Sequence, residues 1–378
     1  MVCLDLSAAF DTVHHETLLN RLSQRYGIKE TAHTWLRSYL INRQQFITIK
    51  GERSELQKKS CDVPQGSVMG PNLYEDYTAP PVADIFRSFG IDYHIYADDK
   101  QAYLAFDPSN MDKALKTMQD CMEAVKTWMV ANWLQLNDSK TECIIFGSKK
   151  NLSLLPSTSV KVGNADIEHS SAIKSIGAYL DAELTMDKQV SSVCRAGWYH
   201  LHQISRISKY LTPEQRKSVL HAHVTSRLDQ NNSLLLGLPK KMLTKLQTLQ
   251  NASARLVTGL KKREHITPTL RKLHWLPVHE RIIFKILLLT FKCLNGMGPS
   301  YLSDMLKPYT PARTLRSSSN NLLQIPNTHY RDTERRSFSV RAPIEWNRLP
   351  LEIKNKKTVA SFKVALKTYL FKSVYKCS

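Results

Sequence analysis

The chain has 378 residues, of which 42% are hydrophobic, and this fits a folded globular protein and excludes a disordered one. Its net charge of +20 is unevenly distributed along the sequence. Residues 1–150 contain 17 Lys and Arg against 19 Asp and Glu, a net −2, whereas the other 228 residues contain 36 against 14, a net +22. A basic excess of this size predicts a polyanionic partner, with nucleic acid first and an acidic membrane second.

The seven cysteines are scattered and form no C-x-x-C pair, which argues against a zinc ribbon or a disulfide framework. Their spacing fits a reducing, intracellular compartment. Met1 leads directly into a strand-like segment, so we expect no signal peptide. The most apolar run, Ile282 to Leu294, contains Lys285 and Lys292 and is too short to span a membrane. It predicts a buried helix and no membrane partner.

Apolar periodicity predicts an α+β first part, residues 1–184, with short strands and amphipathic helices. In chain order, the expected elements are a strand over Val2–Leu6, helices over Glu16–Tyr26 and Thr31–Leu40, a strand over Gln45–Lys50 whose partner after Gly51 runs to Val63, a hairpin of Ile91–Ile95 with Ala102–Phe106, a long helix capped by Ser109 or Asn110, and strands over Thr141–Phe146 and Ile176–Leu180.

The sequence becomes helical and basic after about residue 184, and prolines divide it into short helices. Met242, Leu243, Leu246 and Leu249 fall on one helical face. We expect a loop over Pro311–Arg331 and a final helix over Val359–Tyr375. The predicted domains are therefore 1–184, a helical basic region over 185–300, and a C-terminal region over 301–378.

Two segments carry carboxylates where chemistry with divalent metals would need them. Asp5 ends the first strand in L-D-L-S-A-A-F-D-T-V, and Asp98 and Asp99 lie at the hairpin tip in Y-A-D-D. Hard cations prefer carboxylate oxygens, and a two-metal site holds its ions about 3.5–4 Å apart. Adjacent carboxylates repel each other, although Asp is also common in ordinary turns. Each segment alone is weak evidence for a metal site.

A third segment, V-P-Q-G-S-V-M-G-P over 63–71, places one Pro and two Gly around Gln65. Glycine lets a ligand approach the backbone closely, so the segment fits a binding loop. It fits an ordinary turn equally well.

Taken in order, these three segments resemble the palm motifs of reverse transcriptases. The match is to the form that these motifs take in non-LTR (LINE-type) retrotransposons. The matching residues are Asp5 with Ala9-Phe10-Asp11, Pro64-Gln65-Gly66-Ser67 with Gly70-Pro71, and Tyr96-Ala97-Asp98-Asp99. Leu136-Asn137 with Lys140-Thr141-Glu142 resembles the next motif. The stretches 249–259 (L-Q-N-A-S-A-R-L-V-T-G) and 274–278 (H-W-L-P-V) resemble the C-terminal region of the Jockey and chicken-repeat group.

The resemblance implies an α+β reverse-transcriptase palm with an antiparallel central sheet, followed by a mostly helical, basic thumb-like region. It implies an RNA-directed DNA polymerase that adds dNTPs to a DNA primer on an RNA template with two Mg²⁺ ions, or Mn²⁺ in their place. Asp5, Asp98 and Asp99 would then be catalytic and would hold the metals together with the backbone carbonyl of Leu6. The family also implies a nuclear location.

The substrate-binding residues that the resemblance implies are Phe10, Gln65, Gly66, Tyr96 and Lys140. Phe10 would screen the sugar 2′ position, Gln65 and Gly66 would contact the incoming nucleotide and the template, and Lys140 would lie near the pyrophosphate. Phe10 also fits a core residue, and Lys140 also fits a solvated surface lysine.

The sequence also departs from the family pattern. The family enzymes carry basic fingers before the first carboxylate and an endonuclease further upstream; Met1 lies four residues before Asp5, so we expect an N-terminally truncated copy. Asn72–Tyr77 contains two acids where core residues are expected. Lys100 stands where relatives have a small hydroxyl residue, and we expect it to compete with metal. Asp229 to Asn232 also differs from the family wording.

These departures leave three possibilities open. The first is an RNA-directed DNA polymerase, which we expect to be poorly active as an isolated chain. The second is a catalytically inactive remnant or domesticated fragment that binds nucleic acid through its basic region. A passive product with neither activity is the third possibility. No protein partner is indicated.

Overall fold

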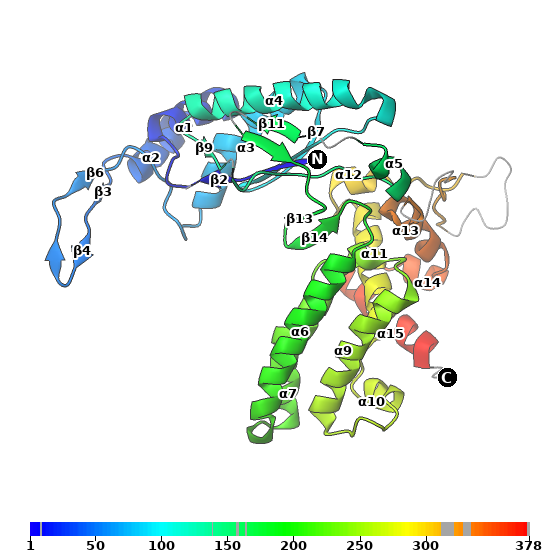
Figure 1. The fold of residues 1–378 in the computed structure, drawn as a ribbon. Helices are drawn as coiled ribbons and strands as arrows, with labels where there is room; N and C mark the ends of the chain where they lie inside the picture. The colour runs from blue at the N-terminus through cyan, green and yellow to red at the C-terminus, as the bar shows by residue number, and fades with distance from the viewer. Residues whose placement is uncertain are drawn as a thin grey trace. The chain divides into compact units, whose positions relative to one another are not determined.

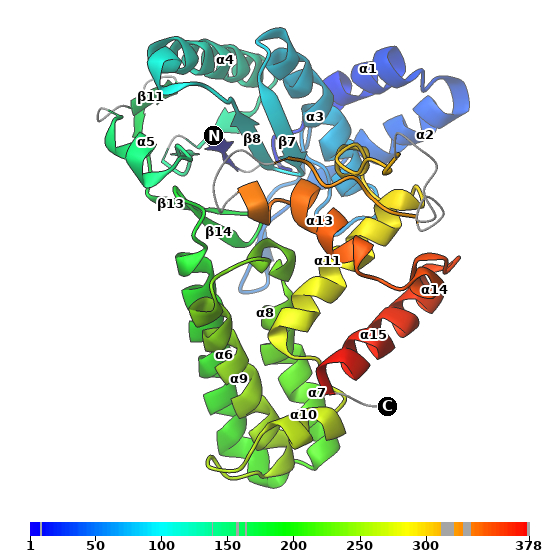
Figure 2. The ribbon, with the colours of Figure 1, turned by 90° about the vertical axis from the view of Figure 1, so that its right-hand side faces the viewer.

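The computed structural model describes residues 1–7, 10–137, 139–155, 159–162, 165–310, 321–327 and 334–375. The chain divides into two compact units, residues 1–183 and 184–378. The first combines helices with short strands, and the second is built from helices (Figures 1 and 2). The predicted α+β class is confirmed. The predicted division of the rest of the chain into regions 185–300 and 301–378 stays a prediction.

A four-stranded antiparallel sheet forms the centre of the first unit. Its order is β10 (Glu142–Cys143), β1 (Val2–Leu4), β8 (Asp99–Tyr103) and β7 (Asp92–Tyr96). β1 pairs on both sides, with Val2 opposite Cys143 on one side and Ala102 on the other. The predicted antiparallel centre and the hairpin are therefore confirmed, although its second strand, predicted over Ala102–Phe106, is Asp99–Tyr103 and so includes Asp99. This arrangement joins the two segments that carry the candidate carboxylates.

One face of this sheet is covered by two long helices. Side chains alternate between the faces of a strand, so Val2 and Leu4 point to the same side, where both are buried. α3 (Gly70–Ser88) and α4 (Met111–Ala131) contribute Phe86 and Met122 to the same core. The core therefore lies between the sheet and these helices, while residues of opposite parity in β1 and β8 face the other side.

Two further helices and an exposed ladder complete this half of the unit. α1 (His15–Tyr26) ends at Gly27, which adopts the left-handed conformation as predicted, and α2 (Glu30–Leu40) follows it. The predicted hairpin around Gly51 is also present. It consists of β3 (Gln44–Gln45) with β6 (Gln57–Lys58) and β4 (Thr48–Ile49) with β5 (Glu52–Arg53), and it extends from the helices in Figure 1.

Helix α3 contains two interior prolines, Pro80 and Pro81. A proline has no N–H, so Pro81 leaves the carbonyl of Tyr77, four residues earlier, without its helical partner. The guanidinium of Arg21 on α1 donates to this carbonyl and also to Asn132 Oδ1 at 2.6 Å. Arg21 therefore satisfies the proline break and ties α1 to α3 and to the end of α4.

The rest of the first unit consists of short elements. The strand predicted over Ile176–Leu180 begins two residues late, because Ile176 and Gly177 have positive φ angles of 44° and 76° and form the turn of a hairpin. The elements are η1 (Pro108–Asn110), β2 (Leu6–Ser7) with β9 (Gln135–Leu136), α5 (Lys149–Ser153), β11 (Ser159–Val162) with β12 (Ala165–Glu168), and β13 (Ala172–Ser175) with β14 (Ala178–Asp181).

The second unit is built from helices joined by loops, with one isolated β-bridge between Pro308 and Leu323 among its described residues. Its elements are α6 (Asp187–Ile207), η2 (Ser208–Tyr210), α7 (Pro213–Leu220), η3 (His221–Thr225), α8 (Ser226–Asp229), η4 (Asn232–Leu235), α9 (Lys240–Thr258), α10 (Thr267–Lys272), α11 (Val278–Leu294), α12 (Ser300–Ser303), η5 (Glu334–Arg336), α13 (Phe338–Asn347), α14 (Leu351–Lys354) and α15 (Val359–Tyr375).

The buried helix predicted over Ile282–Leu294 is confirmed as the core of α11. Phe291 of α11 stacks on Phe362 of α15 at 4.2 Å, and Trp346 of α13 lies against the same ring. The final helix has the predicted bounds. The loop predicted over Pro311–Arg331 falls largely outside the described residues. No helix in the described ranges is both long and apolar enough to cross a membrane.

Candidate active site

Asp5 lies where the first strand passes from β1 into β2. Its backbone carbonyl accepts a hydrogen bond from Asn137 N at 2.9 Å. Leu4 pairs with Lys100 and faces the core, so the next residue, Asp5, faces the opposite side of the sheet. Its side chain is 34% exposed. Continuing the register by one residue places Asp5 across from Asp99.

The adjacent carboxylates lie at the tip of the β7–β8 hairpin. Tyr96 and Asp99 form its last pair, which leaves Ala97 and Asp98 as a two-residue turn. Ala97 has a φ of 53°, in the left-handed region that residues with a Cβ rarely adopt. Such strained positions cluster at functional sites. The hairpin thus holds two exposed carboxylates on a short, strand-supported turn.

The electrostatics of this region indicate that the three carboxylates lie near one another. Burial raises the pKa of Asp99, and the charges of Asp98 and Asp5 raise it further, while Lys100 lowers it. Burial also raises the pKa of the Tyr74 hydroxyl, and Asp98 and Asp5 again add to the shift. Like charges disfavour ionisation only at short range. By register, Asp5 and Asp99 therefore lie on the same face of neighbouring strands, and Asp98 lies in the turn next to Asp99.

Lys140, predicted near the pyrophosphate, lies beside the first carboxylate. Its Nζ is 3.7 Å from Asp5 Oδ2, and its side chain is 69% exposed. An exposed ion pair of this length is weak, of the order of 1 kcal/mol or less. The lysine can therefore leave Asp5 for a stronger anion at little energetic cost.

Lys100 lies on the other side of the sheet from the position we expected. Because Asp99 faces outward, strand alternation turns Lys100 into the core, where its side chain is fully buried. Its Nζ donates to the Ala97 carbonyl at 3.3 Å and to the Tyr74 hydroxyl at 3.5 Å. Burial lowers the Lys100 pKa to about 8, although Asp98 and Asp99 oppose this shift. Lys100 thus supports the turn from beneath instead of approaching the carboxylates from the solvent side.

The donor chemistry of the cluster fits divalent metal ions. Reverse transcriptases use such ions, and Asp5, Asp98 and Asp99 offer carboxylate oxygens, the ligands that Mg²⁺ and Mn²⁺ prefer. Burial raises the pKa of Asp99, and the negative charges of Asp98 and Asp5 raise it further, a repulsion that a cation would relieve. Within the described residues, no three Asp, Glu, His or Cys side chains are close enough to hold one ion together. The two-metal assignment therefore stays a prediction, as does the role of the Leu6 carbonyl in β2.

Phe10 and Tyr96, two of the predicted substrate residues, have different environments. Phe10 stacks on Tyr74 with ring centroids 4.8 Å apart and packs, partly buried, against the core, while its role in sugar screening stays a prediction. Tyr96 is 65% exposed beside the hairpin turn. Tyr74 carried no motif signal, yet it links Phe10 to Lys100.

Gln65 and Gly66 lie in an exposed turn that leads into α3. Gly66 has a φ of 81°. The Ser67 hydroxyl donates to the Pro64 carbonyl at 2.7 Å and accepts from Gly70 N at 3.0 Å, which closes the turn. The glycines are thus needed by the turn itself, and the exposed Gln65 remains available to a ligand.

The acids expected to intrude into the core of α3 do not do so. Glu75 is exposed and Asp76 partly exposed, because the helix turns them outward while Tyr74 and Tyr77 face the core. Burial, with a further contribution from the nearby Asp76, raises the pKa of the Tyr26 hydroxyl to about 12. The expectation of an unpaired buried carboxylate was wrong, because residues 74 and 77 are one helical turn apart and residues 75 and 76 lie off that face.

Comparison with known proteins defines the class of the first unit. Residues 1–180 match the family described as reverse transcriptase (RNA-dependent DNA polymerase). This match covers the sheet, the hairpin and the three carboxylates. Residues 1–180 of this chain are therefore similar to the reverse transcriptase family, as the motifs indicated.

The relatives narrow this class to LINE-type elements. The probable RNA-directed DNA polymerase from transposon BS of Drosophila melanogaster is 25% identical over 300 residues, which is 74% of this chain and 31% of the relative. The RNA-directed DNA polymerase from mobile element jockey of the same species is 26% identical over 222 residues, 57% of this chain and 23% of the relative. The chain thus spans about a third or less of these relatives, and the predicted resemblance to non-LTR polymerases is confirmed.

Proposed function

We propose that this chain contributes the polymerase core of a LINE-type element and adds deoxynucleotides to a DNA primer on an RNA template. The observation that carries this proposal is that Asp5 and Asp99 face the same side of neighbouring strands, with Asp98 in the adjoining turn, within a stretch that matches the reverse transcriptase family. The substrates are a dNTP, an RNA template and a DNA primer. Its proposed location is the nucleus, as for the family.

In this proposal, the three carboxylates hold two Mg²⁺ ions, or Mn²⁺, with the Leu6 carbonyl as a further ligand. When bound, the ions activate the primer 3′-hydroxyl and neutralise the triphosphate. Lys140 leaves its weak contact with Asp5 and pairs with the departing pyrophosphate. Gln65 and Tyr96, both exposed, contact the nucleotide and the template, and Gly66 lets the backbone approach them.

The alternative is a protein that binds nucleic acid without polymerising it. The charge of the second unit supports this function by itself, since residues 184–378 contain 34 Lys and Arg against 10 Asp and Glu. Phosphate contacts by such a surface need no metal, and the affinity should fall steeply with salt. The two functions differ in whether Asp98 is needed.

Extension of a DNA primer on an RNA template, with Mg²⁺ or Mn²⁺, tests the proposal. We expect weak primer extension by the full chain. Asp98→Asn should reduce it to background, because loss of electrostatic stabilisation at the reacting groups typically lowers the rate about a hundredfold or more. Asp84→Asn, an exposed carboxylate on α3, is the matched control and should leave extension unchanged. Equal background signal from all three proteins would favour the non-enzymatic function.

A further inference from the structure

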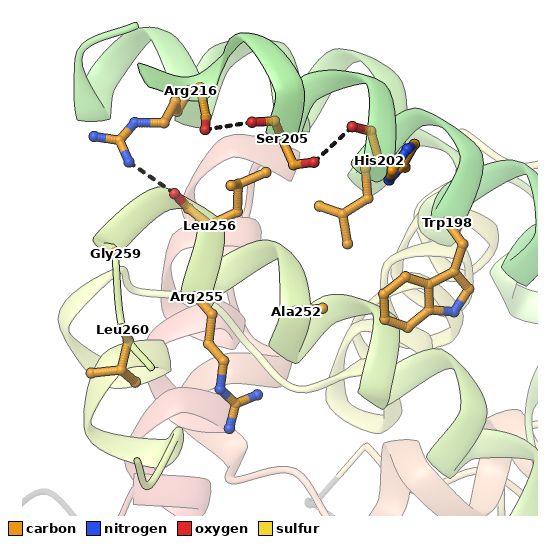
Figure 3. A pocket seen from close by; sticks show the side chains of 11 residues that line it. Trp198, His202, Ser205, Arg216, Ala252, Arg255, Leu256, Gly259 and Leu260 are labelled. Atoms are coloured by element: carbon orange, nitrogen blue, oxygen red, sulfur yellow. Dashed lines mark hydrogen bonds between the residues drawn. The ribbon is translucent and has the colours of Figure 1, made fainter. Parts of the chain in front are cut away.

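The second unit contains a pocket that the proposed chemistry does not use. A cavity of about 520 Å³ lies between α6, α7 and α9, within the size range of small-ligand sites. Figure 3 shows Trp198 of α6 beside Ala252 of α9, and Arg216 of α7 reaching the end of α9. We call this cavity the α6–α9 pocket; its main lining residues are Trp198, Leu201, His202, Arg216, Arg255 and Leu256.

Residues 249–259 of α9 have two faces, and the pocket gives a role to the face that does not pack in the core. In residues 249–259, one face of α9 is structural: Ala254 is fully buried and Gln250 donates to the Leu276 carbonyl at 2.8 Å. The other face, with Ala252 and Arg255, lines the pocket. The stretch therefore combines a core face with a face turned towards a cavity.

Beside the pocket, α6 and α9 make a close contact. A Cβ added at Gly197 of α6 would lie 2.3 Å from Leu249 Cδ2, so the glycine lets the Leu249 side chain pack directly against the α6 backbone. Gly197 directly precedes Trp198, whose side chain is 43% exposed. The contact thus fixes the backbone that carries the indole while leaving the ring accessible.

The two arginines of the pocket have hydrogen-bonding capacity to spare. Arg216 donates to the Leu256 carbonyl at 3.0 Å and Arg255 to the Glu264 carbonyl at 3.2 Å. The Nε of each is buried and has no hydrogen-bond partner among the described residues. The adjoining segments 206–217 and 255–264 contain eight Lys and Arg against two Glu. This surrounding charge favours an anionic ligand.

Exposed aromatic rings among these cations indicate which anion fits. Tyr210 is 76% exposed, and the Lys209 ammonium lies 4.8 Å from its ring centroid. Aromatic rings interleaved with basic side chains are typical of surfaces that stack unpaired bases and hold the flanking phosphates. Bases in a duplex are already stacked and are not available to such a ring.

We infer that the α6–α9 pocket binds an unpaired nucleotide of single-stranded nucleic acid, with the base on Trp198 and its phosphates near Arg216 and Arg255. This inference rests on the proposed binding of nucleic acid by the chain and deepens it by naming a subsite. The shared chemistry of the ligand is a free base on a phosphate backbone, whether it comes from RNA or from a displaced DNA strand.

Fluorescence anisotropy of the full chain with labelled oligouridylate, oligothymidylate and a duplex tests the inference at low salt. We expect Trp198→Ala to weaken single-strand binding by about fivefold or more, the usual effect of losing one stacked base. Trp198→Phe, which keeps a ring, should retain most of the affinity. Tyr199→Ala, an exposed aromatic on the same helix that does not line the pocket, is the matched control and should bind like the unaltered chain. Comparison of the two single strands identifies the source of the base.

Failure of the inference and failure of the proposed function give different results. If Trp198→Ala binds both single strands as tightly as the unaltered chain, or if duplex binding weakens equally, the pocket is not a base site, although nucleic-acid binding stands. If the unaltered chain binds none of the three probes, both are overturned. Loss in Trp198→Ala with recovery in Trp198→Phe supports the pocket and excludes misfolding as the cause.

Discussion

The two units differ in the sign of their charge and in how that charge is arranged. The first, with 19 basic and 23 acidic side chains, concentrates negative charge at a turn that a sheet holds in place. The second, with 34 against 10, spreads positive charge over helices and leaves aromatic rings exposed among it. A metal site needs a few carboxylates at fixed positions, whereas a surface that binds a polyanion needs many cations whose exact positions matter less.

The first unit should be sensitive to loss of Arg21. Arg21→Ala removes the donor to the Tyr77 carbonyl, left without its helical partner by Pro81, and the bond to Asn132. We expect a loss of about 3 kcal/mol in the free energy of unfolding, because hydrogen bonds from charged groups contribute more than neutral ones and a buried carbonyl is left unpaired. Urea titration, with hydrogen exchange to assign the transition to residues 1–183, measures this loss.

Arg25→Ala on the same helix is the matched control. Arg25 pairs with Asp84 at 2.8 Å, but both side chains are well exposed. Such a pair contributes about 1 kcal/mol or less. Equal destabilisation by the two variants would contradict the role assigned to Arg21.

Lys100 should make the stability of the first unit depend on pH. Its pKa in the folded chain is about 8, below the ordinary 10.5, because burial penalises its charge. Between these values the unfolded chain holds a proton that the folded chain has released. Stability should therefore rise as the pH increases from 8 towards 10.5, by roughly 3 kcal/mol at most. The penalty is fully present below pH 8.

Lys100→Met isolates this contribution, because methionine fills similar space without a charge. The stability of the variant should lack the rise that the unaltered chain shows, while tyrosine titration affects both proteins alike. Parallel stability curves for the two proteins would show that Lys100 is not buried as described.

Gly197→Ala probes the second unit and should have the smallest effect. The added methyl group would collide with the end of the fully buried Leu249 side chain, which would have to shift. Overpacking typically costs about 1–3 kcal/mol, and better helix propensity offsets roughly 1 kcal/mol of it. We expect a net loss of about 1 kcal/mol. In a Leu249→Ala background the same substitution should become stabilising; an unchanged sign would contradict the close contact of α6 with α9.

The sequence predicted most of the first unit because its signals are local. Strand alternation, Gly27 at a helix end and the hairpin around Ala97 each depend on neighbouring residues, and the structure has them. The Ile176–Gly177 turn was missed because an apolar residue with positive φ carries no turn signal. Because Asp99 faces outward, strand alternation turns Lys100 inward. We had expected Lys100 to compete with metal because a charged side chain is usually exposed.

The candidate site was predicted in part for the same reason. Asp5, Asp98 and Asp99 belong to short motifs, so their convergence was expected from sequence. Tyr74 and Arg21 act through contacts with residues tens of positions away, and neither lies in a motif that marks this role. Residues of three helices line the α6–α9 pocket, and the sequence does not show that these helices meet. Only the α9 stretch and the basic charge of the region could be recognised from the sequence.

Binding of Mn²⁺ to the full chain, followed by electron paramagnetic resonance, tests the central claim most directly. Residues that merely support metal ligands change affinity by roughly 10- to 100-fold, so loss of a ligand carboxylate should weaken binding at least that much. We predict that Asp5→Asn and Asp98→Asn each weaken Mn²⁺ binding more than about tenfold, while the exposed Asp84→Asn control binds as the unaltered chain does. Equal Mn²⁺ affinity in all four proteins would contradict the assignment of the carboxylate cluster as the metal site.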